Sequence, residues 1–431
     1  ALKAEAGVMI TASHNPAQDN GLKVFGMNGA QVIPPDDALI MAAIDGIAVP
    51  KTVSSFQVLC AEGMVRSVPD QVETDYLLSM ERLRIHRFSG IRIAYTPLHG
   101  VGWRLVKHVL NNAGHMDLHV VTEQAEPDGD FPTVTSPNPE DEEALNRAIS
   151  LAKDLDADLV LANDPDSDRL AVAVPDDQQG SWRILTGDEI SSLLADYLLE
   201  HGPKEGKQLV VTNLLSSGLL EKVVESHEAT YVETRVGFKW VADQAIKWQA
   251  AGGQCVLASE EALGFSAGGV VCDKDGISTA LLMADLSAWC HAQGGTLLSY
   301  LERIYQRYGI YATDKSAFTM PGPEGSDRIR YILDDLRRNP LEEVAGIQVT
   351  RISDRIAGSN TIGFFLYDGS RILARASGSE PKVKFYFRVH ELPAHKPLAD
   401  LEVRAKQRLI RLKNALLERV GLEIEGTIHG K

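Results

Sequence analysis

Three aspartates stand at alternate positions, Asp164, Asp166 and Asp168, in the segment "LVLANDPDSDRLAV". An apolar run that ends at Asn163 precedes them. Side chains at alternate positions of an extended segment point to the same side, so the three carboxylates converge on one point. Their mutual repulsion requires a cation, and ligands that are all oxygens favour Mg²⁺ or Ca²⁺. The segment therefore predicts a divalent metal site.

Other interpretations of the aspartate segment stay open. An acidic turn with no bound ion has the same composition. A phosphatase of the haloacid dehalogenase type also carries two aspartates one residue apart after a buried strand, and its nucleophile would be Asp164. Such a phosphatase usually has Thr or Val at the position of Asp168. An EF-hand fails, because it requires Gly where Arg169 stands and Glu where Pro175 stands.

A second candidate site is Ser13, in the segment "GVMITASHNPAQDNGLKVFG", after a predicted buried strand over Val8 to Ala12. A hydrolase serine requires G-x-S-x-G and a facing base, and we expect the adjacent His14 not to face Ser13. A metal held by aspartates keeps a position for a phosphate oxygen, and a loop serine can carry that phosphate. Lys23 is then positioned to neutralise charge or to move a proton. The alternative is a serine that only caps a helix or a turn.

A third candidate lies near the C-terminus, in "RASGSEPKVKFYF". Arg375 offers a bidentate guanidinium, and Ser377, Gly378 and Ser379 offer hydroxyls and backbone N–H groups around one tight turn. Such a turn suits a phosphate group. A plain hairpin with a Ser-Gly turn is the alternative.

The elements that must position these residues follow a pattern. Apolar strand-like runs alternate with amphipathic helical patterns, which is typical of parallel α/β units. The predicted strands are 91–96, 157–164, 207–214, 228–234 and 252–261, and the predicted helices include 101–113 and 140–155. The alternation fades after about residue 313. There the runs 346–352, 361–368, 371–377 and 382–389 predict a mainly antiparallel sheet, closed by a helix from residue 398 to about 419.

The composition limits the classes of function. The 431 residues, of which 44% are hydrophobic and 24% charged, predict a globular protein of roughly three domains. A net charge of -16 disfavours nucleic acid and anionic membranes as partners. The four cysteines form no C-x-x-C pair, which favours a reducing cytoplasm, and no apolar stretch reaches the ~18 residues of a membrane span. The first predicted strand begins within a few residues of Ala1, so we expect an upstream part to be absent.

In this order and at these separations, the motifs "TASHNP", "DPDSDR", "SEEALG" and "RASGSEP" resemble those of the α-D-phosphohexomutases, which include phosphoglucomutases and phosphomannomutases. The segments "TPLHGVG", "FPTVTSPNPED" and "VGFKW" extend the resemblance along the whole chain. It implies an α/β fold of successive mixed α/β domains around a central cleft, with a C-terminal α+β antiparallel-sheet domain. The implied domains are 1–82, a remnant of domain 1 with the phosphoserine loop, 83–187 with the metal loop, 188–312 with the sugar loop, and 313–431 with the phosphate loop.

The resemblance also implies an activity. The chain would interconvert hexose 1-phosphate and hexose 6-phosphate through a phosphoserine and a sugar 1,6-bisphosphate, which is both intermediate and activator. The implied catalytic residues are Ser13, His14, Lys23 and Arg169. Mg²⁺ would be held by the Ser13 phosphate together with Asp164, Asp166 and Asp168.

Substrate recognition is implied in the same way. Glu260 and Glu261 would hold sugar hydroxyls, although two such glutamates are also typical of an exposed helix start. Further substrate contacts are implied for Lys239, Arg375, Ser377, Gly378, Ser379 and Lys384. Ala262 stands where many members have a sugar-binding serine, and Ser379 where threonine is commoner.

We expect glucose phosphate to be the preferred substrate, with mannose phosphate possible. The partners would be small-molecule sugar phosphates and neither nucleic acid nor membrane. A phosphopentomutase, a phosphatase that uses Asp164, and a phosphosugar-binding fragment without turnover remain alternatives. The sequence does not reveal the oligomeric state.

Overall fold

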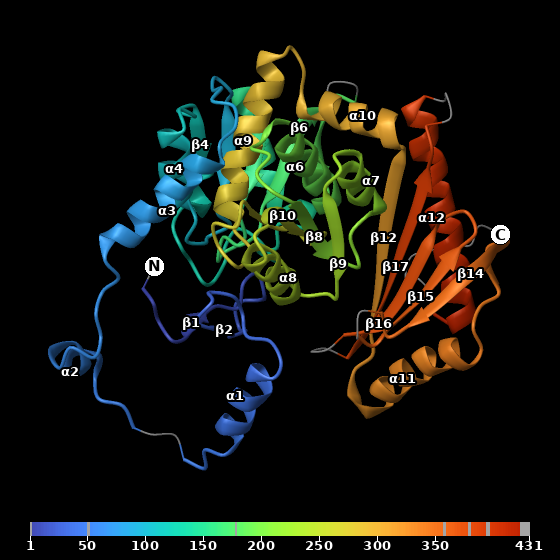
Figure 1. Cartoon of the computed structure of the whole chain (residues 1–431), viewed down its shortest axis with the longest axis horizontal. Coiled ribbons are helices and arrows are strands. Elements are labelled where there is room, and N and C mark those ends of the chain that lie inside the picture. The colour runs from blue at the N-terminus through green and yellow to red at the C-terminus, as the bar shows by residue number, and fades with distance from the viewer. Residues whose placement is uncertain are drawn as a thin grey trace.

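The computed structural model describes residues 2–49, 52–176, 179–356, 359–377, 381–393 and 397–422. Within them the strands form sheets of two, five, four and six strands in chain order (Figure 1). The predicted α/β fold of successive units, with an antiparallel sheet at the C-terminal end, is confirmed.

The five-stranded sheet has the order β4-β3-β5-β6-β7. Its three strands β3, β4 and β5 are parallel, and β6 and β7 are antiparallel. Every residue of β3 and β5 is buried, because α5 packs on both strands and α9 on β5, so continuous apolar runs are required there. The elements of this unit are β3 (Ile93–Thr96), α4 (Trp103–Asn112), β4 (Leu118–Val120), a 3₁₀ turn (Thr122–Gln124), α5 (Glu142–Leu155), β5 (Leu159–Ala162), β6 (Ala171–Asp176) and β7 (Ser181–Leu185).

The four-stranded sheet has the order β11-β10-β8-β9, with β8, β9 and β10 parallel and β11 antiparallel. Its elements are α6 (Gly187–His201), β8 (Gln208–Asn213), α7 (Gly218–Ser226), β9 (Thr230–Thr234), α8 (Phe238–Ala250), β10 (Gln254–Glu260), β11 (Gly264–Ala267), α9 (Gly276–Ala292) and α10 (Leu297–Tyr308). Helix α9 contacts α4 and β5 on one side and α6 and β11 on the other. Nearly all of its residues are buried for that reason, and it joins the two sheets into one core (Figure 1).

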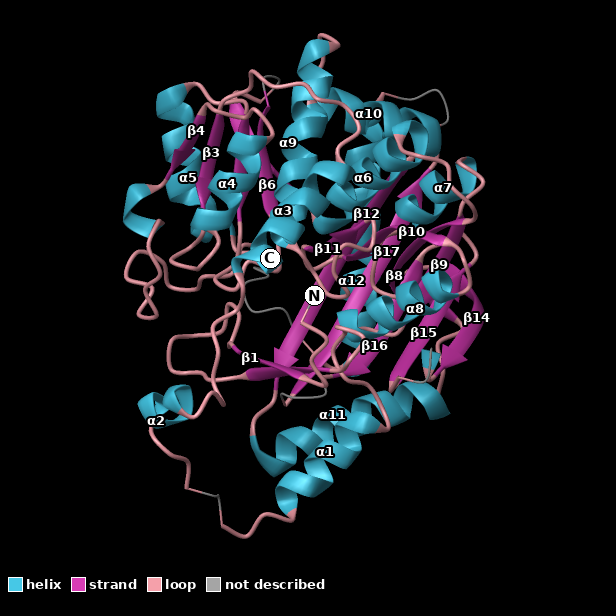
Figure 2. Ribbon diagram, turned by 60° about the vertical axis from the view of Figure 1, so that its left-hand side comes forward, coloured by secondary structure: helices cyan, strands magenta, loops and turns pink. Residues whose placement is uncertain are grey.

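The six-stranded sheet is antiparallel throughout and has the order β12-β17-β16-β15-β14-β13 (Figure 2). In β17 buried residues alternate strictly with half-buried ones, because α11 and α12 cover one face of this sheet. Its elements are β12 (Ile310–Thr319), α11 (Gly322–Arg338), β13 (Glu343–Val344), β14 (Ile347–Asp354), β15 (Thr361–Leu366), β16 (Arg371–Ala376), β17 (Lys382–Glu391) and α12 (Leu398–Val420).

The N-terminal segment is the exception to this compact packing. It contains the hairpin of β1 (Gly7–Ile10) and β2 (Leu22–Phe25), followed by α1 (Asp36–Asp45), α2 (Phe56–Ala61) and α3 (Asp70–Leu83). The strand before Ser13 was predicted to be buried, and this prediction is wrong: Val8 and Ile10 are 63% and 77% exposed. Strand β1 pairs only with β2, and α2 lies apart from the sheets in Figures 1 and 2.

The predicted strands and helices of the remaining chain agree with the structure to within a few residues. The difference is one of direction, since β6 and β11 each run antiparallel beside a predicted parallel strand, β5 and β10. The predicted domain limits stay a prediction, and the limit at residue 312 falls inside β12. In the described part of the chain, no helix combines the length and the apolar character that crossing a membrane requires.

Candidate active site

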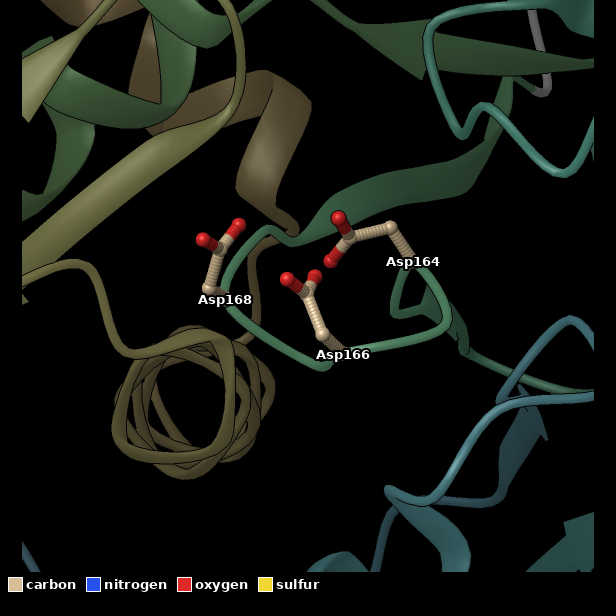
Figure 3. Close-up of side chains that lie close together, drawn as sticks. All are labelled: Asp164, Asp166 and Asp168. Carbon is tan, nitrogen blue, oxygen red and sulfur yellow. The ribbon is translucent and has the colours of Figure 1, made fainter. Parts of the chain in front are cut away.

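The three aspartates lie in the loop that joins β5 to β6. Asn163 and Asp164 directly follow β5 and are fully buried, and the chain then turns so that Asp166 and Asp168 point to the same place (Figure 3). One carboxylate oxygen from each aspartate lies within 4.8 Å of the others. The convergence predicted from the alternate spacing is therefore present.

The loop after β3 packs against the aspartate loop and holds it in place. The backbone N–H of Val101 donates to the carbonyl oxygen of Pro165 at 3.0 Å. A Cβ atom at Gly100 would lie 2.3 Å from the backbone of Pro165, so only glycine permits this approach. The buried Tyr95 hydroxyl donates to Asn163 at 2.9 Å. The "TPLHGVG" segment thus supports the aspartate loop by close backbone packing.

Ser13 reaches this loop from the β1–β2 hairpin. Its Oγ donates to Asp164 Oδ2 at 2.8 Å, although 151 residues separate the two. Its backbone N–H donates to Thr11 Oγ1 at 2.9 Å, and that hydroxyl in turn donates to Asp166 at 3.1 Å. The φ angle of Ser13 is 53°, in the left-handed region. The hydrogen bonds that its N–H and Oγ make offset the strain of this conformation. The serine and the aspartates therefore form one site.

His14 corrects one expectation, because it does face Ser13. Its Nδ1 lies 3.1 Å from Ser13 Oγ, and the left-handed backbone of Ser13 brings the two adjacent side chains together. The same Nδ1 lies 3.8 Å from Asp164. A hydrolase triad requires one ring nitrogen for the serine and the other for the carboxylate, so this arrangement is not a triad.

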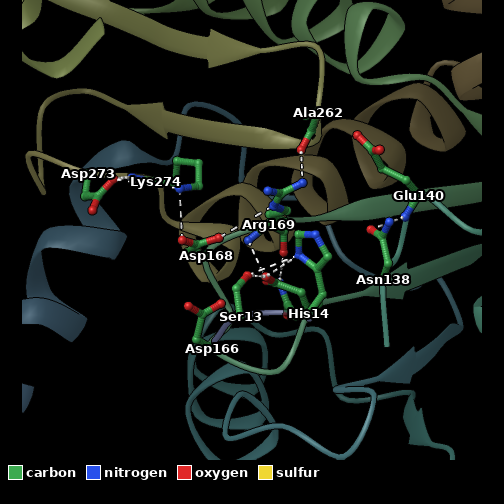
Figure 4. A network of polar contacts seen from close by, with 12 residues as sticks. Ser13, His14, Asn138, Glu140, Asp166, Asp168, Arg169, Ala262, Asp273 and Lys274 are labelled. Carbon is green, nitrogen blue, oxygen red and sulfur yellow. Dashed lines mark hydrogen bonds and ion pairs between the residues drawn. The ribbon is translucent and has the colours of Figure 1, made fainter. Parts of the chain in front are cut away.

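Two lysines balance the charge of the aspartates. Lys23, on β2, donates to Asp166 at 2.8 Å and to Asp168 at 2.6 Å. Burial alone would lower the pKa of Lys23, but the two carboxylates outweigh it and raise that pKa above its ordinary value. Lys274 lies 2.9 Å from Asp168 and is also deeply buried (Figure 4). Sequence reasoning missed Lys274, since nothing in "CDKDG" links it to a loop more than 100 residues earlier.

The donor set fits a hard divalent cation. Asp166 Oδ1 and Asp168 Oδ1 are buried, and in the described structure neither has a hydrogen-bond partner. Buried carboxylate oxygens without partners cost free energy unless a cation or a donor satisfies them. Oxygen ligands alone favour Mg²⁺ or Ca²⁺ over softer metals. Asp164 differs from the other two, because both of its oxygens already accept hydrogen bonds, from Ser13 and from the backbone of Arg169.

Arg169 connects the aspartate loop to the loop after β10. Its guanidinium donates to the carbonyl oxygen of Ala262 at 3.1 Å, and the backbone N–H of Leu170 donates to Leu263 at 3.0 Å (Figure 4). These bonds join a loop of the five-stranded sheet to a loop of the four-stranded sheet. The two loops therefore hold a fixed relative position.

Glu260, at the end of β10, and Glu261, the first residue after it, share one hydrogen-bond donor. The amide group of Asn213 donates to Glu260 at 3.0 Å and to Glu261 at 2.9 Å. Burial, followed by the charge of Glu260, raises the pKa of Glu261 to about 7. Glu261 also lines a cavity of about 340 Å³, to which the units of the five-, four- and six-stranded sheets all contribute residues. These half-buried glutamates lie at the end of a strand, and the alternative of an exposed helix start is wrong.

The remaining predicted residues lie elsewhere. Lys239, on α8, donates to Asp37 of α1 at 3.4 Å and contacts the ring of Trp240. Arg375 and Lys384 lie opposite each other on β16 and β17. Ser377 follows β16 directly, and Gly378 and Ser379 lie outside the described residues. The predicted phosphate loop is therefore described only at its two ends.

Comparison with family models gives three matches along the chain. The models are described as phosphoglucomutase/phosphomannomutase alpha/beta/alpha domains I, II and III, and they match residues 1–50, 74–179 and 186–308. Together the three models cover more than half of the chain, in the order of their domain numbers.

Curated relatives carry three related names. A probable phosphomannomutase of Haemophilus influenzae is 37% identical over 389 residues, which cover 88% of this chain and 76% of that protein. A phosphoglucomutase of Staphylococcus epidermidis is 32% identical over 405 residues, covering 89% and 73%. The phosphopentomutase of Homo sapiens is 32% identical over 420 residues, covering 89% and 68%.

Solved structures share the fold. The open form of a Paramecium phosphoglucomutase, parafusin, superposes with a TM-score of 0.68 at 20% identity and covers 98% of this chain and 79% of that one. An Aspergillus fumigatus N-acetylphosphoglucosamine mutase, solved with GlcNAc-6P and magnesium, gives a TM-score of 0.51 at 15% identity and covers 95% and 89%.

Proposed function

The chain belongs to the phosphoglucomutase/phosphomannomutase family of phosphomutases, the α-D-phosphohexomutases, and on that premise we propose that it interconverts hexose 1-phosphate and hexose 6-phosphate. The observation that carries this proposal is the hydrogen bond from Ser13 to Asp164. It brings a hydroxyl nucleophile to a group of carboxylates that suits a divalent metal, which is the combination that phosphoryl transfer requires.

In the proposed reaction Ser13 carries the phosphoryl group. The bond between phosphorus and Ser13 Oγ breaks, a bond between phosphorus and a sugar hydroxyl oxygen forms, and the hydroxyl proton ends on Ser13. The product is a sugar bisphosphate. Its other phosphate then returns to Ser13 in the reverse process, so phosphate and protons balance over the cycle.

Each nearby residue has a part in this proposal. His14 Nδ1, 3.1 Å from Ser13 Oγ, delivers or accepts the proton at that oxygen. Lys23 and Arg169 balance the charge around the transferring group. Asp164, Asp166 and Asp168 would hold Mg²⁺, which when bound supplies a Lewis acid for the phosphoryl oxygens.

We assign the recognition of the sugar to Glu260 and Glu261, whose carboxylates accept hydrogen bonds from hydroxyl groups. We assign the grip on the phosphate that is not reacting to Arg375, Ser377, Gly378, Ser379 and Lys384, and the cleft contact of Lys239 stays a proposal of the same kind. The four proposed units divide at about residues 82, 187 and 312.

Glucose phosphate is the proposed preferred substrate, with mannose phosphate accepted and a sugar 1,6-bisphosphate as activator. The names of the relatives support a range of sugars that includes pentose phosphate. A phosphatase that uses Asp164 as nucleophile is less well supported. Asp164 is fully buried and both of its oxygens accept hydrogen bonds, so a phosphorus atom has no free approach to it.

Turnover tests the proposal directly. The full chain is incubated with glucose 1-phosphate, Mg²⁺ and a trace of glucose 1,6-bisphosphate, and glucose 6-phosphate is measured over time. We expect its formation to depend on both additions and to stop in EDTA. Release of inorganic phosphate without glucose 6-phosphate would contradict a mutase and favour the phosphatase.

A further inference from the structure

Asn213 contacts both Glu260, the last residue of β10, and Glu261, which follows it. It is the last residue of β8, the central parallel strand of the four-stranded sheet, and only 1% of it is exposed. Groups at the carboxyl ends of parallel strands are the ones that face a ligand in open α/β sheets. Asn213 itself is too deeply buried to contact a ligand, so any effect it has on binding passes through the groups that it contacts.

The amide orientation of Asn213 is fixed by its neighbours. The backbone N–H of Leu215 donates to Asn213 Oδ1 at 2.8 Å, which identifies the opposite side of the amide as the NH₂ group. That group donates one hydrogen bond to Glu260 at 3.0 Å and one to Glu261 at 2.9 Å. Both N–H donors of the side chain are therefore used on the two glutamates.

The two glutamates are directed to different surroundings by this shared donor. Glu260 Oε1 also accepts from the backbone N–H of Gly237 at 3.1 Å, which ties it to the start of α8. Glu261 instead lines the cavity of about 340 Å³. Without the amide, two adjacent carboxylates would repel each other and no donor from β8 would hold them apart. The amide supplies a donor to each carboxylate without adding a charge of its own.

We propose that Asn213 is a positioning residue of sugar recognition, which holds Glu260 and Glu261 as separate acceptors for sugar hydroxyls. The inference rests on the proposed function, since it presumes that the two glutamates bind the sugar. Asn213 touches neither the sugar nor Ser13, so its loss acts on binding and on discrimination between sugars more than on phosphoryl transfer.

The first test replaces Asn213 by Asp, which has the same shape and keeps the acceptor for Leu215 but loses both donors. We expect KM for glucose 1-phosphate to rise by about tenfold to a hundredfold, since hydrogen bonds to charged groups are lost, while kcat changes by less than about threefold. The preference for glucose 1-phosphate over ribose 1-phosphate falls in parallel. Asn213→Ala, which adds no charge, gives the same direction.

Ser216→Ala is the matched control. Ser216 is buried three residues further along the chain, and its hydroxyl contacts Thr212 at 2.6 Å and neither glutamate. Thermal unfolding of all variants measures the stability that each substitution removes. A KM and a sugar preference that change equally in Ser216→Ala and in the Asn213 variants would reduce Asn213 to a structural residue and overturn the inference.

The pH dependence of KM separates positioning from general damage. The hydrogen bond from Asn213 favours the charged form of Glu261, so its loss raises the pKa of Glu261 further. The rise in KM of Asn213→Ala is then largest below pH 7 and shrinks toward pH 9, whereas a structural defect gives the same rise at every pH. The charged and titratable groups that face Glu261 across the cavity and from neighbouring elements are Glu260, Asp188, Glu140, Glu142, Asp314, Lys315, Arg371, Tyr386 and Arg388.

Calorimetric binding of glucose 1-phosphate keeps this inference separate from the proposed reaction. A wild-type chain that binds the sugar phosphate without turnover contradicts the mutase, and weaker binding by Asn213→Asp still supports the inference. Equal binding by wild type and variant overturns the inference even if turnover is present. A wild-type chain that binds no sugar phosphate contradicts the assignment of the glutamates and the inference with it.

Discussion

The hydroxyl of Ser13 lies 2.8 Å from a carboxylate oxygen of Asp164, and the two residues come from loops of different sheets. Three further residues of the same hairpin, Thr11, His14 and Lys23, also contact the aspartates. A hairpin whose first strand is mostly exposed is thus held to the core by its polar side chains. This attachment is the structural basis of the proposed mechanism.

Ser13→Ala should reduce mutase turnover by on the order of a thousandfold or more, because it removes the hydroxyl that is bonded to Asp164 and that carries the phosphoryl group in the proposal. Sugar phosphate binding should remain, since the glutamates are untouched. Steady-state turnover and calorimetric binding measure the two effects, with Ser79→Ala on α3 as the control. Normal turnover by Ser13→Ala would remove the serine from the mechanism.

Asp166→Asn should lower turnover by about a hundredfold or more and change the unfolding midpoint by only a few degrees. Lys23 keeps its bond to Asp168, so the fold does not depend on the substituted carboxylate. Reduced repulsion among the aspartates would on its own favour the folded state, but Lys23 and Lys274 already offset that repulsion. Asp154→Asn on α5 is the control, and indifference of the wild-type enzyme to EDTA would contradict the metal site.

Ala262→Ser should sharpen the preference for a hexose, because it adds a hydroxyl beside the two glutamates. The carbonyl oxygen of Ala262, which Arg169 holds, is unchanged by the substitution. We expect wild-type kcat/KM values for glucose, mannose and ribose 1-phosphates within about a hundredfold of one another and a wider spread in the variant. Strict selectivity of the wild type for one sugar would argue against this account.

Glu261→Gln should raise the unfolding midpoint at pH 8 by a few degrees and have little effect at pH 4.5. Burial raises the pKa of Glu261 from 4.5 to about 7, so the folded state binds its proton more tightly than the unfolded state. This tighter proton binding adds to the free energy of unfolding below pH 4.5, and the contribution is lost as the pH rises through 7. Thermal unfolding between pH 4.5 and 8 measures this, with Glu143→Gln, at an exposed position of α5, as the control. A pH-independent difference would contradict the prediction.

The sequence was informative where short-range patterns determine geometry. The alternate spacing of the aspartates after β5 predicted their convergence, because extended backbone directs every second side chain to one side. The apolar runs of β3, β5 and β8 predicted buried strands for a similar reason. The same reasoning failed for β1, whose apolar side chains are exposed, since a run of apolar residues does not reveal what packs against it.

The sequence did not predict which residues far apart in the chain contact one another at the site. The sequence around Lys274 and Asn213 contains no motif that sets these residues apart. Only the packing of β8, β10 and α9 brings them to the site. The contact of His14 with Ser13 depends on the left-handed φ angle of Ser13, which no sequence motif predicts. Such positions require the tertiary structure.

Phosphoryl labelling tests the central claim most directly. The full chain is incubated with glucose 1,6-bisphosphate that carries labelled phosphorus, digested and mapped, and each labelled peptide is treated with hydroxylamine. The account predicts one labelled peptide containing Ser13, stable to hydroxylamine because the linkage is a phosphate ester of serine. A hydroxylamine-labile label on Asp164, or a chain that takes up no label while it binds the sugar bisphosphate, would contradict it.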